Sequence, residues 1–244
     1  MKKMIILLLM ASSIFAAQVV ELAGDKSYPP YSYSQDGQAK GLYVDILKTA
    51  FDKMPEYSLK LNMVAFKRAI NMTKQGKIIA FFPPYFSEKR SVWMTFSEPL
   101  LDENTIIFAK QKELLKKLKF PDDFYGKTVC LNRGFSHTVM GGDKFEQAIK
   151  DNKLKLVTGK SNKACLNRVN RGVADFYIND QLIDISAFPS IKKGMSVKAN
   201  FGHLGFTLKD KNYPFSKNFQ KRFNKVIKEM NQNGEIEKII QKYK

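Results

Sequence analysis

Histidine, cysteine and tryptophan are scarce in this 244-residue sequence, which has two histidines, two cysteines and one tryptophan. The histidines, His137 and His203, lie in different regions of the chain. No Cys/His spacing resembles the closely spaced ligand pairs of a structural zinc site. We therefore predict neither a metal site nor a cofactor.

Long apolar runs are absent after the first residues. Met4–Met10 is apolar throughout, follows Lys2 and Lys3, and precedes the small residues Ala11–Ser13, with Ala16 as the expected last residue before cleavage. A membrane span needs about 20 residues, so we predict that residues 1–16 are a cleaved signal peptide, with an uncleaved anchor as the less favoured alternative. No cysteine follows the run, which excludes a lipid-anchored mature N-terminus. A secreted chain without an anchor indicates the periplasm.

Acidic residues are in the minority, with 23 against 41 basic residues and a formal net charge of +18. Such an excess is typical of proteins that bind nucleic acid or anionic membranes. The lysines are scattered, however, and a secretion signal separates the chain from most nucleic acid. We therefore expect a basic soluble surface, no nucleic-acid partner and a weak preference for anionic solutes. The charged run Lys112–Lys119 is expected to be a solvated helix face.

The cysteines are Cys130 and Cys165. In an oxidising compartment an even pair predicts one disulfide. Two free, buried thiols are the alternative.

Strands and helices alternate twice along the chain. The length allows one large or two small domains, and alternation of this kind predicts parallel sheets covered by helices. The first unit has expected strands at Val19–Ala23, Leu59–Met63 and Ile78–Phe82, with helices from Leu42 to before Pro55 and over Phe66–Gln75. The second begins near Gln111, with strands at Thr128–Leu131, Leu154–Val157 and Ala174–Ile178 and helices over Met140–Asp151 and Ser161–Arg171.

Two connectors separate the units, Thr105–Ala109 on the way out and Val197–Leu208 on the way back. A terminal helix follows, and Gly234 is expected to end it. Its apolar face is formed by Phe219, Phe223, Val226, Ile227 and Met230.

Several short motifs follow one another in a characteristic order. They are Tyr28–Tyr33 (YPPYSY), Gly41–Leu47 (GLYVDIL), Gly76-Lys77, Ser87–Arg90 (SEKR), Phe96–Pro99 (FSEP), Gly126–Val129 (GKTV) and Arg171–Asp175 (RGVAD). In order and spacing the chain resembles the extracellular solute-binding proteins of family 3, the polar amino-acid-binding components of bacterial ABC importers. The likeness covers nearly the whole mature chain.

The resemblance implies an α/β periplasmic-binding-protein fold of type II, the Venus-flytrap arrangement. Each lobe would be a mostly parallel sheet flanked by helices, and two hinge strands would join the lobes. Lobe 1 would comprise residues 17–108 and 199–244, and lobe 2 residues 109–198. The expected protein is a monomer that captures a small polar solute, an amino acid or amino-acid-like carboxylate, for the membrane permease of an ABC importer.

Two charged residues are the main binding candidates. Arg90 follows the predicted strand Ile78–Phe82, and its guanidinium offers paired donors that match a carboxylate. The resemblance implies that Arg90 holds the solute's α-carboxylate and that Asp180, after the strand Ala174–Ile178, accepts its amine. The alternatives are a surface arginine and a helix cap. Because the two residues belong to different lobes, a zwitterion would bridge them and couple binding to closure.

The other candidates lie in loops. Tyr28 and Tyr31 can cover a bound side chain or pack in the core, and Asp25 can contact the solute's distal part. Ser136 and Thr138 follow Gly134 in a loop that can present N–H groups to an anion, or are ordinary turn residues. In the loop before Arg90, Pro83 and Pro84 cannot donate backbone hydrogen bonds, so this loop departs from the carboxylate-binding loop that is usual in the family. We expect Phe82, Tyr85 and Trp93 to make the pocket aromatic, although core packing explains Trp93 equally well.

Two other functions are compatible with the same fold. One is a sensory module that presents a solute to a receptor. The other is a dehydratase-like enzyme, which would need a positioned acid or base. His137 and Glu88 are the available candidates, but no feature distinguishes them, so we predict a binding protein and not an enzyme.

Overall fold

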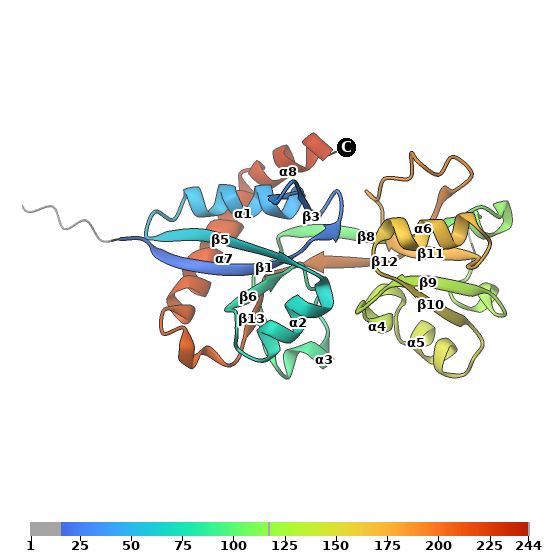
Figure 1. Cartoon of the computed structure of the whole chain (residues 1–244), viewed down its shortest axis with the longest axis horizontal. Coiled ribbons are helices and arrows are strands. Elements are labelled where there is room, and N and C mark those ends of the chain that lie inside the picture. The colour runs from blue at the N-terminus through green and yellow to red at the C-terminus, as the bar shows by residue number, and fades with distance from the viewer. Residues whose placement is uncertain (1–15, 117, 244) are drawn as a thin grey trace, which may run out of the picture.

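The computed structural model describes residues 16–116 and 118–243, which form two lobes side by side along the long axis. Two strands, β8 (Leu101–Ala109) and β12 (Lys192–Gly202), run between the lobes (Figure 1). The predicted signal peptide, except for Ala16, lies outside the described residues. In the described part of the chain, no helix has the length and apolar character needed to span a bilayer.

Lobe 1 is built on a five-stranded sheet of order β5-β1-β6-β13-β7. The strands β5, β1 and β6 are parallel, and the returning strand β13 pairs antiparallel with β6 and β7. The parallel order expected from the alternation is thus confirmed for the first three strands. The strand bounds are β1 Gln18–Asp25, β5 Tyr57–Val64, β6 Ala80–Phe82, β7 Met94–Phe96 and β13 Gly205–Thr207.

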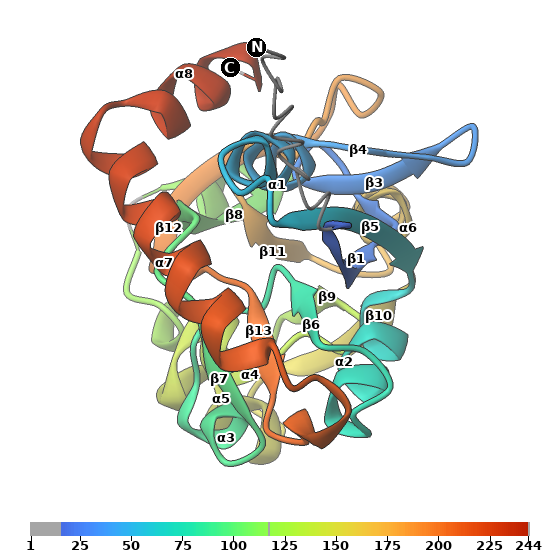
Figure 2. The same ribbon diagram turned by 90° about the vertical axis from the view of Figure 1, so that its left-hand side faces the viewer.

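Helices cover both faces of this sheet. Side chains of a strand alternate between faces, so Leu22 packs with α1 and α7, and Ala23 packs with α2. Figure 2 views lobe 1 from its outer end, with α1 and α7 on one side of the strands and α2 on the other. The helices are α1 Leu42–Asp52, α2 Phe66–Lys74, α3 Glu88–Ser91, α7 Ser216–Gln232 and α8 Glu235–Ile240.

The turn-rich segment after β1 contains more structure than the sequence analysis expected. Three short strands, β2 (Ser27–Tyr28), β3 (Ser32–Gln35) and β4 (Gln38–Lys40), form a small antiparallel sheet. Asp36 and Gly37 make its two-residue turn at φ +52° and +76°. An Asp-Gly pair favours this hairpin turn, so the sequence does contain the signal for it.

Lobe 2 has a sheet of order β10-β9-β11-β8-β12. The strands β9 (Thr128–Asn132), β10 (Lys155–Gly159) and β11 (Phe176–Asp180) are parallel, whereas β8 and β12 join antiparallel. Both lobes are therefore parallel at one side of the sheet and antiparallel where a chain crossing enters. The α/β, two-lobed fold with two crossing strands is confirmed.

Two helix predictions in lobe 2 need correction. The expected helix Met140–Asp151 is two helices, α4 (His137–Gly141) and α5 (Asp143–Lys150), because Gly142 at φ +86° breaks it. Among the described residues of the run Lys112–Lys119, a single 3-10 turn, Lys112–Leu115, takes the place of the expected helix. The helix α6 (Asn162–Asn170) is as expected, and Ser161 caps it by accepting a hydrogen bond from the Ala164 N–H.

The predicted disulfide is present in lobe 2. Cys130 of β9 and Cys165 of α6 are both fully buried, with a sulfur–sulfur distance of 2.00 Å. The bond links a central strand to the helix that covers it.

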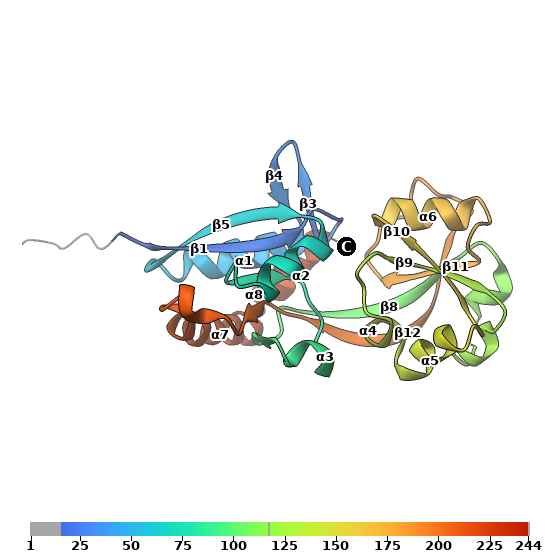
Figure 3. The same cartoon turned by 60° about the horizontal axis from the view of Figure 1, so that its bottom comes forward.

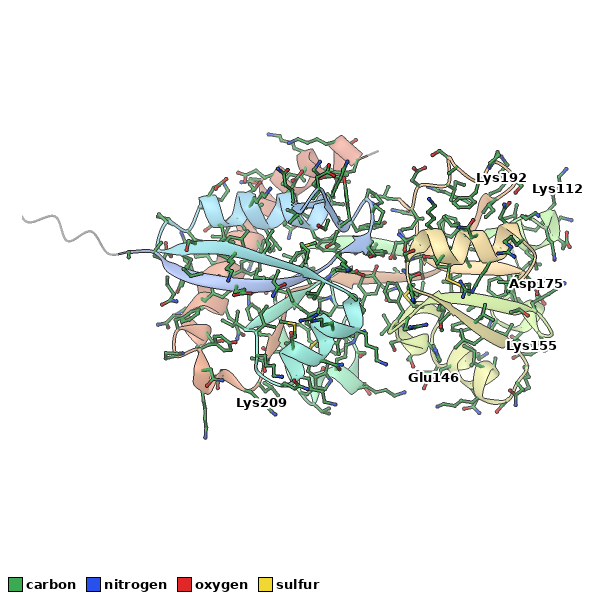
Figure 4. The ribbon with its side chains drawn as sticks, viewed as in Figure 1. Lys112, Glu146, Lys155, Asp175, Lys192 and Lys209 are labelled. Atoms are coloured by element: carbon green, nitrogen blue, oxygen red, sulfur yellow. A yellow bond between two sulfur atoms is a disulfide. The ribbon has the colours of Figure 1, made fainter. Side chains whose placement is uncertain are left out.

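Most lysines of this basic chain are exposed on the surface. Lys112, Lys155 and Lys192 point outward from the end of lobe 2 remote from lobe 1 (Figure 4). This placement agrees with the expected basic, solvated surface.

Candidate functional site

A cavity lies between the two lobes, at the carboxyl ends of β1 and β6 and beside the start of α4. Open α/β sheets bind ligands at such edges. Figure 3 shows the lobes facing one another, with β8 and β12 running along one side. Lobe 1 contributes Asp25, Tyr28, Phe66, Pro83, Tyr85 and Arg90 to the lining, and lobe 2 contributes Phe135, Ser136, Val139 and Met140. Five of the eight candidate binding residues therefore meet here.

Arg90 brings a buried cation to this cavity. Its side chain is 9% exposed, and Nη1 donates a hydrogen bond of 3.0 Å to the Tyr85 carbonyl. The guanidinium carbon lies 5.8 Å from the centre of the Phe66 ring. Burial lowers the pKa of Arg90 to about 10, so it remains charged at neutral pH. Within the described residues no carboxylate forms a salt bridge with Arg90.

A buried cation without a counter-charge raises the free energy of the folded state, and an anionic partner offsets this cost. The remaining guanidinium N–H groups can bind a carboxylate in a forked geometry. The position of Arg90 therefore suits an anionic ligand group.

Asp180 lies deeper than the cavity wall. It is the last residue of β11, is fully buried, and pairs in register with Thr105 of β8. Neither carboxylate oxygen has a hydrogen-bond partner in another described residue. Burial raises the pKa of Asp180 well above its ordinary value. The structure thus places Arg90 and Asp180 in different lobes, but only Arg90 lines the cavity.

A chain of hydroxyl and carboxyl groups runs from the cavity to the crossing strands. The Tyr28 hydroxyl donates to Asn179 Oδ1 at 3.3 Å and lies 3.5 Å from the Tyr85 hydroxyl. Tyr85 in turn donates to Glu103 of β8 at 2.9 Å, and Tyr43 of α1 donates to the other Glu103 oxygen. Burial raises the pKa of Glu103 to about 8.

Glu103, Tyr43 and Asn179 were not among the binding residues predicted from the sequence. No local motif marks them, because strand pairing and helix packing bring them together. Glu103 lies in the polar stretch Asp102–Thr105, which leads into the predicted connector, and nothing in that stretch distinguishes it.

Tyr31 packs beside the site and does not line it. Its ring stacks on Tyr28 with centroids 4.9 Å apart, and its hydroxyl accepts a hydrogen bond of 3.2 Å from the Leu182 N–H in lobe 2. A second hydrogen bond joins the lobes where Asn162 Nδ2 donates to the Pro29 carbonyl at 3.1 Å. The lobes are thus in direct contact around the cavity.

Ser136 and Thr138 have different positions. Ser136 lines the cavity and caps α4, accepting from the Val139 N–H at 3.4 Å. The Thr138 hydroxyl instead donates to Glu146 of α5, outside the cavity lining. Of these two predicted residues, only Ser136 therefore lies at the cavity.

Asp25 is the last residue of β1 and lines the cavity. It is 5% exposed, and its carboxylate accepts a hydrogen bond of 3.0 Å from the Ser27 N–H. Burial raises the pKa of Asp25 to about 7, against the lowering effects of that hydrogen bond and of Lys26. Its carboxyl group is therefore partly protonated near neutral pH.

The expected aromatic pocket is only partly formed by the residues named for it. Tyr85 lines the cavity, but Phe82 is fully buried and Trp93 stacks on Phe81 at 6.4 Å. Phe66 and Phe135, which meet edge to face at 5.3 Å, supply aromatic walls that the sequence analysis did not identify.

The acid–base candidates of the enzyme alternative are not in the cavity lining. Glu88 is exposed on α3, and the His137 ring packs against Phe145 with centroids 6.5 Å apart. Among residues 16–116 and 118–243, no group of three His, Cys, Asp or Glu side chains is arranged to hold a metal ion.

The sequence is similar to a known family of proteins and to a relative of that kind. The model for "Bacterial extracellular solute-binding proteins, family 3" matches residues 20–244. A Vibrio harveyi protein named "Putative amino-acid ABC transporter-binding protein PatH" is 25% identical over 246 residues, covering 96% of this chain and 92% of its own length.

Solved structures share the fold at lower identity. A histidine kinase sensor domain with similarity to periplasmic binding proteins superposes with a TM-score of 0.78 at 19% identity, covering 93% of this chain and 96% of its own. A P235GK mutant of ArgBP from T. maritima gives a TM-score of 0.74 at 18% identity, covering 92% and 94%.

Proposed function

The chain belongs to family 3 of the bacterial extracellular solute-binding proteins, and we propose that it binds an amino acid or amino-acid-like carboxylate between its lobes. The observation that carries this proposal is Arg90, a buried cation without a salt-bridge partner among the described residues, in a cavity shared by both lobes. In the proposed complex its guanidinium holds the α-carboxylate of the solute. The name of the Vibrio harveyi relative supports the amino-acid class.

Asp180 provides the acidic group for the solute's amine. Its carboxyl has no hydrogen-bond partner in another described residue, and an ammonium group would supply both hydrogen bonds and a counter-charge. Tyr28 touches the neighbouring Asn179 in the present arrangement. Asp180 itself is fully buried, so the solute's amine can reach it only if the packing around it opens.

The remaining cavity residues shape the solute's surroundings. Tyr28 and Tyr85 provide hydroxyl groups and ring faces, and Ser136 places the start of α4 beside the anion. Asp25 lies where the solute's distal part would reach. Tyr31 and Thr138 act indirectly, through contacts with Tyr28 and Glu146.

Delivery to an ABC importer follows from the family. We place the protein in the periplasm as a monomer without cofactor, where it would present the loaded, closed form to a membrane permease. The signal peptide proposed for residues 1–16 would direct it there. The family model and the name of the Vibrio harveyi relative both describe binding proteins, which supports binding and not turnover as the proposed role.

A ligand screen tests this function. A thermal-shift series over the amino acids and related small acids should give at least one stabilising ligand, since a ligand at 100 times its Kd stabilises by about 2.7 kcal/mol. The Arg90→Ala variant is the matched control and should lose that response. Absence of any response in the parent protein, or an equal response in the variant, would contradict the proposal.

A sensory role is the second candidate, because a histidine kinase sensor domain shares the fold over 93% of this chain. Both roles use the same cavity. Capture of the loaded protein by a permease in a pull-down supports import, whereas ligand-dependent capture by a receptor kinase supports sensing.

A further inference from the structure

A second cavity adjoins the candidate site on the far side of Asp25. It shares Asp25, Phe66 and Phe135 with the first cavity, so the two cavities are direct neighbours, and both are lined by residues of both lobes. We call this second cavity the basic mouth, because its lining includes four cationic side chains: Lys26, Lys67, Arg133 and Lys160.

The cations come from both lobes and converge on one space. Lys26 follows β1, and Lys67 lies in the first turn of α2. Arg133 follows β9, and Lys160 follows β10. A Cβ added at Gly134 would lie 3.5 Å from the Lys67 Cβ, so the Arg133–Gly134 loop of lobe 2 lies against the start of α2 in lobe 1.

Negative charge in the mouth is low. Asp25 is its only acidic lining residue among the described part of the chain, and it is 5% exposed. None of the four cations takes part in a salt bridge or donates a side-chain hydrogen bond within residues 16–116 and 118–243. Elsewhere, Lys53, Lys60, Lys89 and Arg222 each pair with a glutamate.

Two helices also begin at this mouth. Ala65, the N-cap of α2, and Ser161, the N-cap of α6, both line it. Backbone N–H groups at a helix start and the helix dipole both favour an anion. These fixed dipoles add to the four side-chain charges and come from opposite lobes, so an anion there would help hold the lobes together.

Resting on the proposed function, we propose that the solute carries a second anionic group, a distal carboxylate, which the basic mouth binds while Arg90 holds the first. The solute class is then acidic amino acids and their short derivatives, and not cationic amino acids. A distal ammonium or guanidinium would meet four like charges. Asp25, with a pKa near 7, can be protonated there and donate a hydrogen bond to a carboxylate.

Matched acid and amide ligands test the charge directly. Isothermal titration of the protein with L-glutamate against L-glutamine, and L-aspartate against L-asparagine, changes one charged group at nearly constant shape. The acid of at least one pair should bind tenfold or more tightly than its amide, and L-arginine should bind more weakly than both. The affinity for the acid should fall as salt rises, because exposed charges are screened.

Variants of the mouth locate the effect. Lys67→Gln combined with Arg133→Gln should weaken binding of the acid by about tenfold and leave the amide within twofold. The control, Lys112→Gln combined with Lys155→Gln, removes the same charge from the outer end of lobe 2 (Figure 4) and should leave the acid unchanged. Tighter binding of the amide or of L-arginine, or equal loss in the two double variants, would overturn the proposal.

Glutarate separates this inference from the proposed function, since it has two carboxylates and no amine. If no amino acid binds, the amino-acid role fails. Glutarate binding that is lost on Lys67→Gln with Arg133→Gln still supports an anion site at the mouth, and glutarate binding that is unchanged in that double variant rejects it.

Discussion

Lys89 of α3 and Glu146 of α5 form an ion pair across the two lobes, with 2.8 Å between Lys89 Nζ and Glu146 Oε1. The same carboxylate also pairs with Lys150 of its own helix at 3.1 Å. One acidic residue thus has two cationic partners, and only one of them lies in the other lobe. A change at Lys89 therefore removes a contact between the lobes, whereas a change at Lys150 removes a contact within α5 alone.

Loss of the inter-lobe pair should favour the open form slightly. Lys89 is 71% exposed, and exposed pairs contribute only about 0.2–1 kcal/mol. Lys89→Gln should therefore weaken ligand binding about twofold at low salt and not at high salt, as measured by calorimetry. Lys150→Gln breaks only the pair within lobe 2 and should leave affinity unchanged. Equal effects of the two variants would remove Lys89 from the closure mechanism.

Arg90 should be indispensable for binding. Replacing one partner of a buried charge pair costs about 3–5 kcal/mol, so Arg90→Ala should reduce affinity more than a hundredfold. Arg90→Lys should restore only part of it, because an ammonium lacks the forked donors. Arg68→Ala on the exposed face of α2 is the control. An alanine variant that binds within threefold of the parent would contradict the carboxylate role.

A site residue could be predicted from the sequence only where its position depends on nearby residues in the chain. Arg90, Tyr28 and Asp25 lie at or after strand ends and, for Arg90 and Tyr28, in motifs of the resembled family, so the sequence could predict that they come together, and all three line the cavity. Glu103 and Asn179 could not be found in this way, because their partners lie 60 and 151 residues away in sequence.

The sequence also could not show which of two neighbouring loop residues, Ser136 or Thr138, lines the cavity. Thr138 was grouped with Ser136 because both follow Gly134. The helix α4 begins between them, so Ser136 caps its start and lines the cavity while Thr138 reaches Glu146. The two-residue spacing does not determine which side chain faces the cleft until the first helical residue is known.

Stability should fall as the pH rises through the range in which Glu103 titrates. Its pKa is about 8 in the folded protein against 4.5 ordinarily, so the folded state binds the proton more tightly. The stabilisation is complete below pH 4.5 and is lost towards pH 8, by at most about 1.4 kcal/mol per pH unit. Asp25 and Asp180, whose pKa values are also raised, act in the same direction.

Glu103→Gln should flatten this dependence in urea unfolding measured from pH 5 to pH 9. Above pH 8 the variant should be more stable than the parent, because it buries no charge. The exposed Glu113→Gln is the control and should follow the parent curve. A Glu103→Gln curve parallel to that of the parent would show that this carboxyl does not titrate as described.

The disulfide should stabilise lobe 2. Cys130 and Cys165 are separated by 35 positions, and closing such a loop stabilises by about 3–4 kcal/mol on the chain-entropy account. Cys130→Ala combined with Cys165→Ala should lower the free energy of unfolding by that amount and make it insensitive to reductant. Intact-mass analysis of periplasmically expressed protein should show no free thiol, and two free thiols would contradict the assignment.

Ligand binding should close the lobes measurably. Two crossing strands, β8 and β12, restrict relative motion to a hinge, and the groups proposed to bind the solute lie on both sides of it. A solute stabilises the closed state only through its additional contacts there. The radius of gyration in solution scattering should therefore fall on saturation with the ligand found in the screen.

Asp180→Ala separates the ligand's contribution from that of the protein. Because the Asp180 carboxyl is buried without a hydrogen-bond partner in another described residue, its removal should not destabilise the fold near neutral pH. It should nevertheless weaken binding and reduce the compaction at equal ligand concentration, since the amine would lose its counter-charge. A scattering curve that is unchanged on saturation of the parent would mean that the lobes do not move or that the solute binds elsewhere. Full compaction and affinity in Asp180→Ala would remove Asp180 from the site and leave Arg90 as the charged anchor.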